Sequence, residues 1–216
     1  MKIRPEFIEK WSHYLRHKEW DVFGGEGFRV WGHGDFPFVV SLIPDGVKNI
    51  LEIGCADGYM LHLMKEKGMD PIGLTYSDGE KKCCDEHGLK AIVGDMHDLP
   101  FENQQFDAVI SRQTIEHALS HVMVLCEMNR VTKIGGYNIM HVPYAINCDE
   151  DVNKDNRWHF CAFSPEQWKY FLKMFGFSKV LSEGRTPEQG AWWVVTQKTH
   201  DYEDNFKDIK NVSLDR

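Results

Sequence analysis

From residue 47 onward, the chain alternates between short apolar segments and segments that suit helices. The apolar segments predict strands at 47–53, 71–75, 89–93, 106–111 and 137–142. The intervening segments predict helices at 59–67, 78–87 and 121–132, the last of which we expect the glycine pair 135–136 to close. Strands that alternate with helices build a parallel sheet with helices on both faces. We therefore expect an α/β fold.

The C-terminal third departs from this alternation. Ser164, Pro165 and Gln167 have the pattern of a helix start with a capping box, and Gly176 is expected to end that helix. Two strands follow at 177–182 and 191–197, and the turn-rich stretch between them contains no helix. These two strands are therefore expected to pair antiparallel. The polar tail from residue 200 is expected to be frayed or peripheral.

The N-terminal region is rich in aromatic residues and glycine, with nine aromatic side chains in residues 1–40. We interpret it as a helix followed by an aromatic segment with glycine hinges. Such a segment can pack on the main domain or close over a pocket as a lid, and both alternatives stay open. The expected organisation is an N-terminal helix and aromatic cap (1–46), a main domain (47–199) and a polar tail (200–216).

Charge and cysteine usage narrow the function classes. The 216 residues carry a formal net charge of −8, which disfavours a general nucleic-acid binder. No apolar run is long enough to span a bilayer, and the charged N-terminus lacks a signal-peptide core. None of the six cysteines forms a C-x-x-C pair, so neither a zinc cage nor a redox motif is indicated. We expect a soluble, cytoplasmic protein with reduced thiols, no membrane partner and no metal.

The segment 50–58, ILEIGCADG, carries the strongest chemical signal. An apolar strand runs into a turn with Gly54 and Gly58, and this turn opens a helix. Glycines let the backbone approach a ligand, and the helix N-terminus presents free N–H groups, which suits nucleotides and their relatives. The spacing is Gly-x-Ala-x-Gly, whereas dinucleotide-binding proteins have G-x-G-x-x-G. A nicotinamide-dependent oxidoreductase is therefore disfavoured.

This segment resembles the first motif of the class I S-adenosylmethionine-dependent methyltransferases, an acidic residue followed by G-x-G-x-G. Glu52 takes the acidic position, Gly54 and Gly58 the outer glycines, and Ala56 the middle one. The likeness continues through 73–77, 94–101, 106–117, 134–137 and 159–176, and is greatest to the small-molecule, type 11-like branch. It implies a Rossmann-like fold with a seven-stranded, mostly parallel sheet in the order 3-2-1-4-5-7-6.

The resemblance also implies S-adenosyl-L-methionine as the cofactor and assigns the residues that contact it. The implied set is Glu52, Gly54, Ala56, Gly58, Thr75, Tyr76, Asp95, Met96, Ser111 and Gln113. Gly54 and Ala56 would line the methionine end, and Glu52 would organise the contact to its amino group. Asp95 and Met96 would cover the adenine, with Asp95 accepting a hydrogen bond from the exocyclic amine. Tyr76 could stack on the ring.

The end of the second strand departs from the family pattern. Many members have Asp or Glu there to hold the ribose hydroxyls, whereas this chain has Thr75. A neutral hydroxyl can still form a hydrogen bond, but charge-assisted bonds are roughly twice as strong. The wording around Thr75 resembles the cyclopropane-fatty-acid synthase branch, so the cofactor is not excluded. Asp78 could substitute if the turn folds back.

Three histidines are candidate general bases: His117, His141 and His159. Each is expected near the carboxyl ends of the strands or in the loop that follows, where ligands bind in open α/β sheets. A histidine could remove a proton from the methyl acceptor. A structural, hydrogen-bonded histidine is the alternative for each.

The function that the sequence favours is in-line methyl transfer to an O- or N-nucleophile of a small molecule. The N-terminal aromatic residues and the loop 145–160 would close over that acceptor. Two alternatives remain: a non-catalytic S-adenosylmethionine-binding module, and a methyltransferase that acts on protein or nucleic acid. The sequence does not indicate an oligomeric state.

Overall fold

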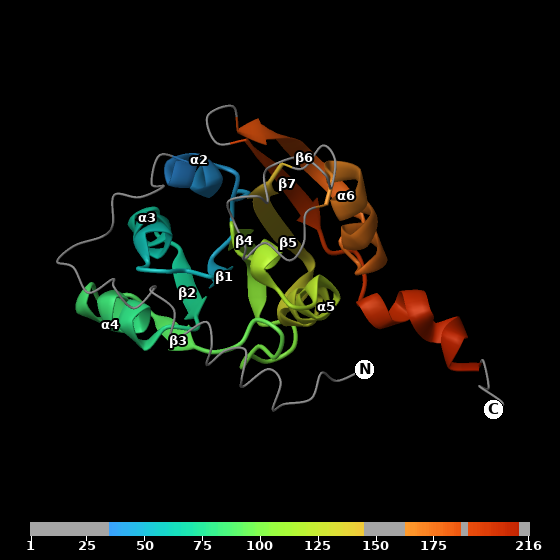
Figure 1. The fold of residues 1–216 in the computed structure, drawn as a ribbon, viewed down its shortest axis with the longest axis horizontal. Helices are drawn as coiled ribbons and strands as arrows, with labels where there is room; N and C mark the ends of the chain where they lie inside the picture. The colour runs from blue at the N-terminus through green and yellow to red at the C-terminus, as the bar shows by residue number, and fades with distance from the viewer. Residues whose placement is uncertain (1–34, 145–162, 187–189, 212–216) are drawn as a thin grey trace.

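A computed structural model describes residues 35–144, 163–186 and 190–211. One seven-stranded sheet with the order β3-β2-β1-β4-β5-β7-β6 forms its centre (Figure 1). The strands are β1 (Asn49–Ile53), β2 (Asp70–Thr75), β3 (Ala91–Val93), β4 (Phe106–Arg112), β5 (Thr132–Pro143), β6 (Lys179–Thr186) and β7 (Ala191–Gln197). Strands β1 to β5 pair in parallel, and β7 pairs antiparallel with both β5 and β6. The predicted fold class, strand order and antiparallel pair are confirmed.

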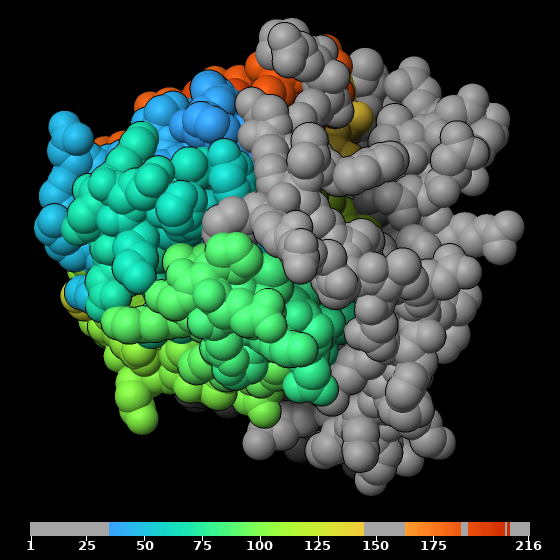
Figure 2. Space-filling model, turned by 90° about the vertical axis from the view of Figure 1, so that its left-hand side faces the viewer, coloured from blue at the N-terminus to red at the C-terminus, as the bar shows by residue number. Residues whose placement is uncertain are grey.

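Helices cover both faces of the sheet. They are α2 (Phe36–Ser41), α3 (Tyr59–Glu66), α4 (Asp78–Glu86), α5 (His121–Val131) and α6 (Pro165–Met174), with 3-10 helices η3 (Ile115–His117) and η5 (Tyr202–Asn211). Figure 2 looks onto the side that α3 and α4 form, where their surfaces lie next to each other with α2 above them. Helices α5 and α6 lie on the other side of the sheet (Figure 1).

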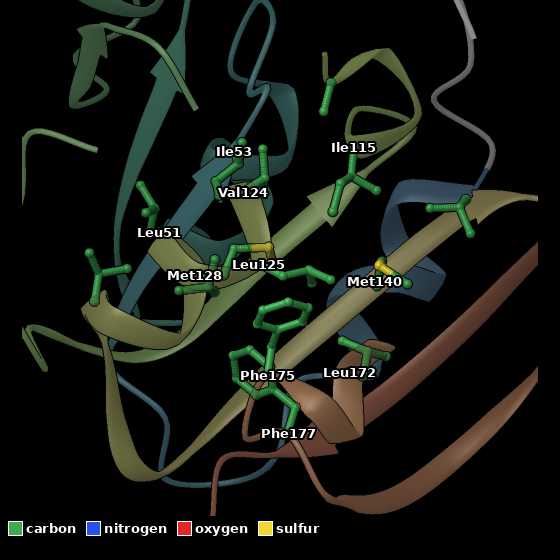
Figure 3. Packing of buried hydrophobic residues seen from close by; sticks show 14 of the residues in the cluster. Leu51, Ile53, Ile115, Val124, Leu125, Met128, Met140, Leu172, Phe175 and Phe177 are labelled. Atoms are coloured by element: carbon green, nitrogen blue, oxygen red, sulfur yellow. The ribbon is translucent and has the colours of Figure 1, made fainter. Parts of the chain in front are cut away.

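The core consists of two apolar clusters, one on each face of the sheet. Leu51 and Ile53 of β1 belong to the cluster under α5 and α6, whereas Ile50 belongs to the one under α2, α3 and α4. This alternation follows from the period of two of a β-strand. Figure 3 shows the first cluster, in which Phe175, Phe177 and Leu172 meet Met140 of β5. A sheet that is apolar on both faces leaves its strand ends as the place for polar chemistry.

Helix α6 begins as its sequence predicts. The Ser164 hydroxyl accepts from the Gln167 N–H (3.3 Å), and the Gln167 side chain accepts from the Ser164 N–H (2.9 Å). This reciprocal pair is a capping box, with Pro165 in the first turn.

The expectation that Gly135 and Gly136 close a helix is wrong. Helix α5 ends at Val131 and β5 begins at Thr132, so both glycines lie inside a strand. They form an irregularity there, because Thr132 pairs with Phe106 and the next pair joins Tyr137 to Ala108. Gly135 has φ +79°, and a Cβ on Gly136 would lie 2.8 Å from the Asp107 carbonyl oxygen. Glycine is needed for this bulge rather than for a helix end.

The stretch 183–186, expected to belong to a turn, is also strand. Strand β6 continues to Thr186, and Glu183 through Thr186 pair with β7. Trp193 of β7 explains part of this, because it lies against the backbone of Gly184, where a Cβ would come within 2.7 Å of its ring. Cross-strand packing therefore extends the hairpin through residues whose local preference is for a turn.

The two ends of the described chain are attached more firmly than their composition suggests. Val39 and Val40 of α2 are buried in the second cluster. Phe38 of the same helix meets Trp193 edge to face. In the tail, the Asn129 amide donates to the His200 carbonyl (3.1 Å) and accepts from the Tyr202 N–H (3.2 Å). The tail is therefore anchored where it leaves β7, although η5 then points away from the body (Figure 1).

Several sequence predictions lie outside the described residues. These are the helix and lid expected before residue 35, the loop 145–160, and His159. Within the described part of the chain, no helix is both long enough and apolar enough to cross a membrane.

Candidate cofactor and active site

The turn after β1 has the backbone shape that its glycines predict. Gly54 and Gly58 have φ values of +78° and +87°, and Ala56 has φ +47° although it carries a side chain. The N–H groups of Gly54 and Cys55 both donate to the Leu74 carbonyl (2.8 and 3.0 Å), which fastens the turn to β2. Ala56 is exposed, so the middle of the turn is the part that a ligand can reach.

Glu52 lies on β1 just before this turn and is only 2% exposed. Its Oε2 atom has no hydrogen-bond partner in the structure. Burial raises the pKa of the carboxyl well above its ordinary value, although the Arg112 guanidinium acts in the opposite direction. A buried carboxylate with an unmade bond is unfavourable by itself. A cationic ligand group such as an ammonium would supply the missing donor.

At the end of β2, Thr75 does not stand alone. Its buried hydroxyl donates to a carboxylate oxygen of Glu80, and it accepts from the Ser77 N–H (3.1 Å). Asp78, the substitute that the sequence suggested, is exposed; the carboxylate that folds back to β2 belongs to Glu80. Ser77 caps α4 and accepts from the Glu80 N–H (3.3 Å). The Ser-x-x-Glu spacing of a capping box could have identified Glu80 from sequence.

Tyr76 is half-buried between Thr75 and Ser77, so it lies at the carboxyl end of β2. The turn after β3 then brings Asp95 and Met96 to the same edge of the sheet. Asp95 Oδ1 accepts from both the backbone N–H of His97 (2.9 Å) and the ring Nδ1 of His97 (2.6 Å). Met96 is half-buried and packs against the first core cluster.

The end of β4 touches the turn after β1. Ser111 is fully buried, and its hydroxyl has no partner in the structure. Gln113 turns the chain with φ +47°, and its N–H donates to the His141 carbonyl (2.7 Å). Thr114 then fills the space beside Gly54, where a Cβ would lie 2.2 Å from the Thr114 hydroxyl. The two turns therefore form one continuous surface.

Arg112 is held by an acid from a distant part of the chain. Asp35, just before α2, accepts from Arg112 Nε (3.0 Å) and Nη2 (2.5 Å). The guanidinium also lies over the Phe36 ring, 4.0 Å from its centroid. This arrangement ties the N-terminal end of the described chain to the end of β4. Sequence reasoning missed Asp35, because no local pattern connects residues so far apart.

His141, at the end of β5, is fully buried in the same network. Its Nδ1 lies 3.3 Å from the Gln113 amide nitrogen, and its Nε2 lies 2.9 Å from the Thr186 hydroxyl and 3.5 Å from Asp35 Oδ2. An amide nitrogen can only donate, so Nδ1 accepts and Nε2 carries the proton. Burial lowers the pKa of the ring to about 4. His141 is therefore neutral, with both nitrogens occupied.

The 3-10 turn η3 contributes Glu116 and His117. Glu116 is 1% exposed, and neither carboxyl oxygen has a hydrogen-bond partner in the structure. Burial raises its pKa to about 8. His117 is half-buried, and its backbone N–H donates to the Thr114 carbonyl (3.0 Å). The described residues contain no cluster of His, Cys, Asp and Glu that could hold a metal ion.

The predicted cofactor residues thus lie at or just after the carboxyl ends of β1, β2, β3 and β4, which is the edge where open α/β sheets bind ligands. Residues 51–140 match the family model described as a methyltransferase domain. This match covers less than half of the chain, and it agrees with the resemblance of residues 50–58 to the class I methyltransferases.

The curated relatives that the chain matches are named for varied acceptors. The chain is 34% identical over 97 residues to norajmaline N-methyltransferase of Rauvolfia serpentina, which covers 41% of this chain and 33% of the relative. It is 28% identical over 155 residues to a sarcosine/dimethylglycine N-methyltransferase of Aphanothece halophytica, covering 61% and 56%. It is 27% identical over 179 residues to an Arabidopsis thaliana tRNA (carboxymethyluridine(34)-5-O)-methyltransferase, covering 78% and 41%.

The chain spans between about a third and just over half of the length of these three relatives. Among solved structures, it resembles a methyltransferase from Haloferax volcanii in complex with the Trm112 activator. That likeness has a TM-score of 0.69 at 17% identity and covers 92% of this chain and 100% of the other. At this level of identity, the likeness is evidence for the fold of the chain alone.

Proposed function

We propose that the protein transfers a methyl group from S-adenosyl-L-methionine to an O- or N-nucleophile of a small molecule. The observation that carries this proposal is the Glu52 carboxylate, which is buried beside the glycine turn and has one oxygen that no described residue donates to. The amino group of a methionine moiety is a cation of the size and charge that would satisfy it. The turn beside it exposes Ala56 for close backbone contact.

The remaining polar groups fit the other parts of such a cofactor. Thr75 and the Glu80 carboxylate would hold the ribose hydroxyls at the end of β2, which restores the acid that the strand itself lacks. Asp95 would accept from the adenine amine, with Met96 and Tyr76 against the ring. Ser111 and Gln113 would lie near the methionine and its methyl group.

When bound, the cofactor supplies an activated methyl group on a sulfonium. The chain's own contribution is to orient the reactants and exclude water, for which effective molarities can reach on the order of 10⁵–10⁸ M. Gln113 is suited to the acceptor side because His141 engages its amide nitrogen. Its amide oxygen is then the atom available to accept from an N–H or O–H of the methyl acceptor.

His117, His141 and His159 remain the proposed candidates for a base. His141 could take a proton only if Gln113 first released Nδ1, because that nitrogen is its one acceptor. His117 lies in η3, the 3-10 turn that follows β4. A positioned base contributes about 10²–10⁴ to the rate where the acceptor must lose a proton.

We favour a small acceptor because the chain carries a net charge of −8 and relatives are named for norajmaline, sarcosine and a fatty acid. A tRNA acceptor is the second candidate, since a relative named for it matches 78% of the chain. An RNA acceptor would show salt-dependent binding, whereas a small neutral one would not. A non-catalytic cofactor-binding module is a further alternative.

Calorimetric titration with S-adenosylhomocysteine, S-adenosylmethionine and NADH tests the cofactor. We expect the two sulfur ligands to bind and NADH not to bind. The Asp95→Ala variant should weaken both sulfur ligands, while the surface variant Asp85→Asn should not. Binding of NADH alone, or of none of the three, would reject the proposed cofactor. Product formation on a panel of amines, carboxylic acids and transfer RNA then separates enzyme from binding module.

A further inference from the structure

His97 joins the adenine-side turn to the start of α5. It is 6% exposed, and its ring Nδ1 lies 2.6 Å from Asp95 Oδ1. Its other ring nitrogen, Nε2, lies 3.2 Å from the backbone N–H of Ser120. A histidine held at both nitrogens has a defined ring orientation.

The Ser120 contact decides where the ring proton lies. A backbone N–H can only donate, so Nε2 accepts and carries no proton. A neutral ring then has its proton on Nδ1, and this proton is donated to Asp95 Oδ1. The geometry of the two contacts therefore defines one tautomer, with a donor directed at Asp95.

The anchor for this donor is rigid. Ser120 is the N-cap of α5, where its hydroxyl accepts from the Met123 N–H (3.4 Å). Three residues of α5, Val124, Leu125 and Met128, are fully buried in the first core cluster. The position of His97 is thus set by a packed helix rather than by the turn that it supports.

We propose that His97 is a positioning residue that orients the Asp95 carboxylate toward the 6-amino group of the adenine. The inference rests on the proposed function. Asp95 lies half-buried in a turn rather than in a helix or strand, and hydrogen bonds weaken steeply when they are misaligned. Two donors on Oδ1, one from the backbone and one from the ring, fix the plane of the carboxylate. Selection of a 6-amino over a 6-oxo purine follows from that fixed plane.

Two substitutions separate the contacts of the ring. His97→Asn places an amide nitrogen near the Nδ1 position, so it can keep the donor to Asp95 and lose the contact to Ser120. His97→Gln places an amide oxygen near the Nε2 position, so it can keep the Ser120 contact and lose the donor. A merely structural role predicts similar effects for both.

The readout is the ratio of dissociation constants for S-adenosylhomocysteine and S-inosylhomocysteine, measured by calorimetry. We expect the wild type to prefer the adenosyl ligand by about 10- to 100-fold, the range of a hydrogen bond to a charged group. His97→Asn should keep most of this preference, and His97→Gln should reduce it to about threefold or less. Equal ratios in wild type and His97→Gln would overturn the proposal.

Asp95→Asn provides a second test that does not depend on the folding of a His97 variant. With its Oδ1 held by His97, the new amide nitrogen would face the base as a donor, so the preference should turn toward the inosyl ligand. An unchanged preference in Asp95→Asn would reject the adenine contact itself. If the wild type binds neither ligand, the proposed cofactor is wrong, which is distinguishable from failure of the His97 role alone.

Discussion

The turns after β1 and β4 have similar backbone conformations, but the buried acids beside them differ in their hydrogen bonding. Each has a non-glycine residue with positive φ, Ala56 in one and Gln113 in the other. Each has a buried glutamate, Glu52 or Glu116, whose pKa is raised by burial. Among the described residues, Glu52 has one oxygen without a hydrogen-bond partner, whereas Glu116 has two. From this comparison we infer that Glu52 pairs with a cationic group of a ligand, whereas Glu116 is a neutral, protonated acid.

The turn after β4 has an additional restraint, the Asp35–Arg112 ion pair. Removing this pair should change the free energy of unfolding more than any other substitution proposed below. We expect Asp35→Asn to lower the free energy of unfolding by about 3–5 kcal/mol, because the ion pair is largely shielded from water and Arg112 loses the negative charge of Asp35. Urea denaturation measures the change. The exposed pair Lys81–Asp85 is the matched control, for which Asp85→Asn should cost less than about 1 kcal/mol. Equal effects in the two variants would mean that Asp35 does not restrain the β4 turn.

The two glutamates should separate most clearly in cofactor affinity. Glu52→Gln removes the charge proposed to meet the ligand ammonium, so binding of S-adenosylhomocysteine should weaken by about 10- to 100-fold. Glu116→Gln should change it by less than about threefold, because that carboxyl is proposed to be neutral in the working protein. Calorimetry on both variants checks this. Similar losses of affinity in the two variants would show that the two glutamates do not differ in their role.

Stability against pH sharpens the role of Glu116. Its pKa is about 8 in the folded protein and 4.5 ordinarily, so the folded state holds a proton that the unfolded state has released between these values. The free energy of unfolding should therefore fall as pH rises, by about 1.4 kcal/mol per unit from this group. Denaturation of wild type and Glu116→Gln from pH 5 to 8 isolates the contribution. A pH-independent difference would show that Glu116 is already ionised.

The smallest effect is expected at the left-handed alanine. An alanine at φ +47° is strained by about 1–2 kcal/mol, and glycine there costs about 0.5–1 kcal/mol in chain entropy. Ala56→Gly should thus raise the free energy of unfolding by about 0.5–1 kcal/mol. Gln104→Gly, at φ +53°, is the control: it should stabilise similarly without altering cofactor affinity. Destabilisation by Ala56→Gly would indicate that the turn is not strained.

Prediction from sequence succeeded where a local pattern specified the structure. The strand–glycine–helix signal of 50–58 and the capping box at Ser164 were both sufficient by themselves. The strand order came from the family resemblance, since periodicity says nothing about which strands are neighbours. Glu80 could have been found from its capping-box spacing, but it was not.

The errors arose where tertiary contacts override local preference. Gly135 and Gly136 resemble a helix stop in sequence, yet pairing with β4 makes them a bulge. Residues 183–186 resemble a turn, yet packing on Trp193 keeps them in a strand. The Asp35–Arg112 pair and the contacts of His141 join residues that no spacing rule connects, so only the folded chain reveals them.

The contact between Gly54 and Thr114 constrains how this protein can change over generations. Because the Thr114 hydroxyl occupies the space of any side chain at position 54, a substitution there must wait for a smaller residue at 114. The opposite order of substitutions avoids this clash, because replacing Thr114 by a smaller residue first leaves Gly54 unchanged. A side chain at position 54 would still be strained after that change, because Gly54 has φ +78°, so position 54 should stay glycine even where position 114 varies.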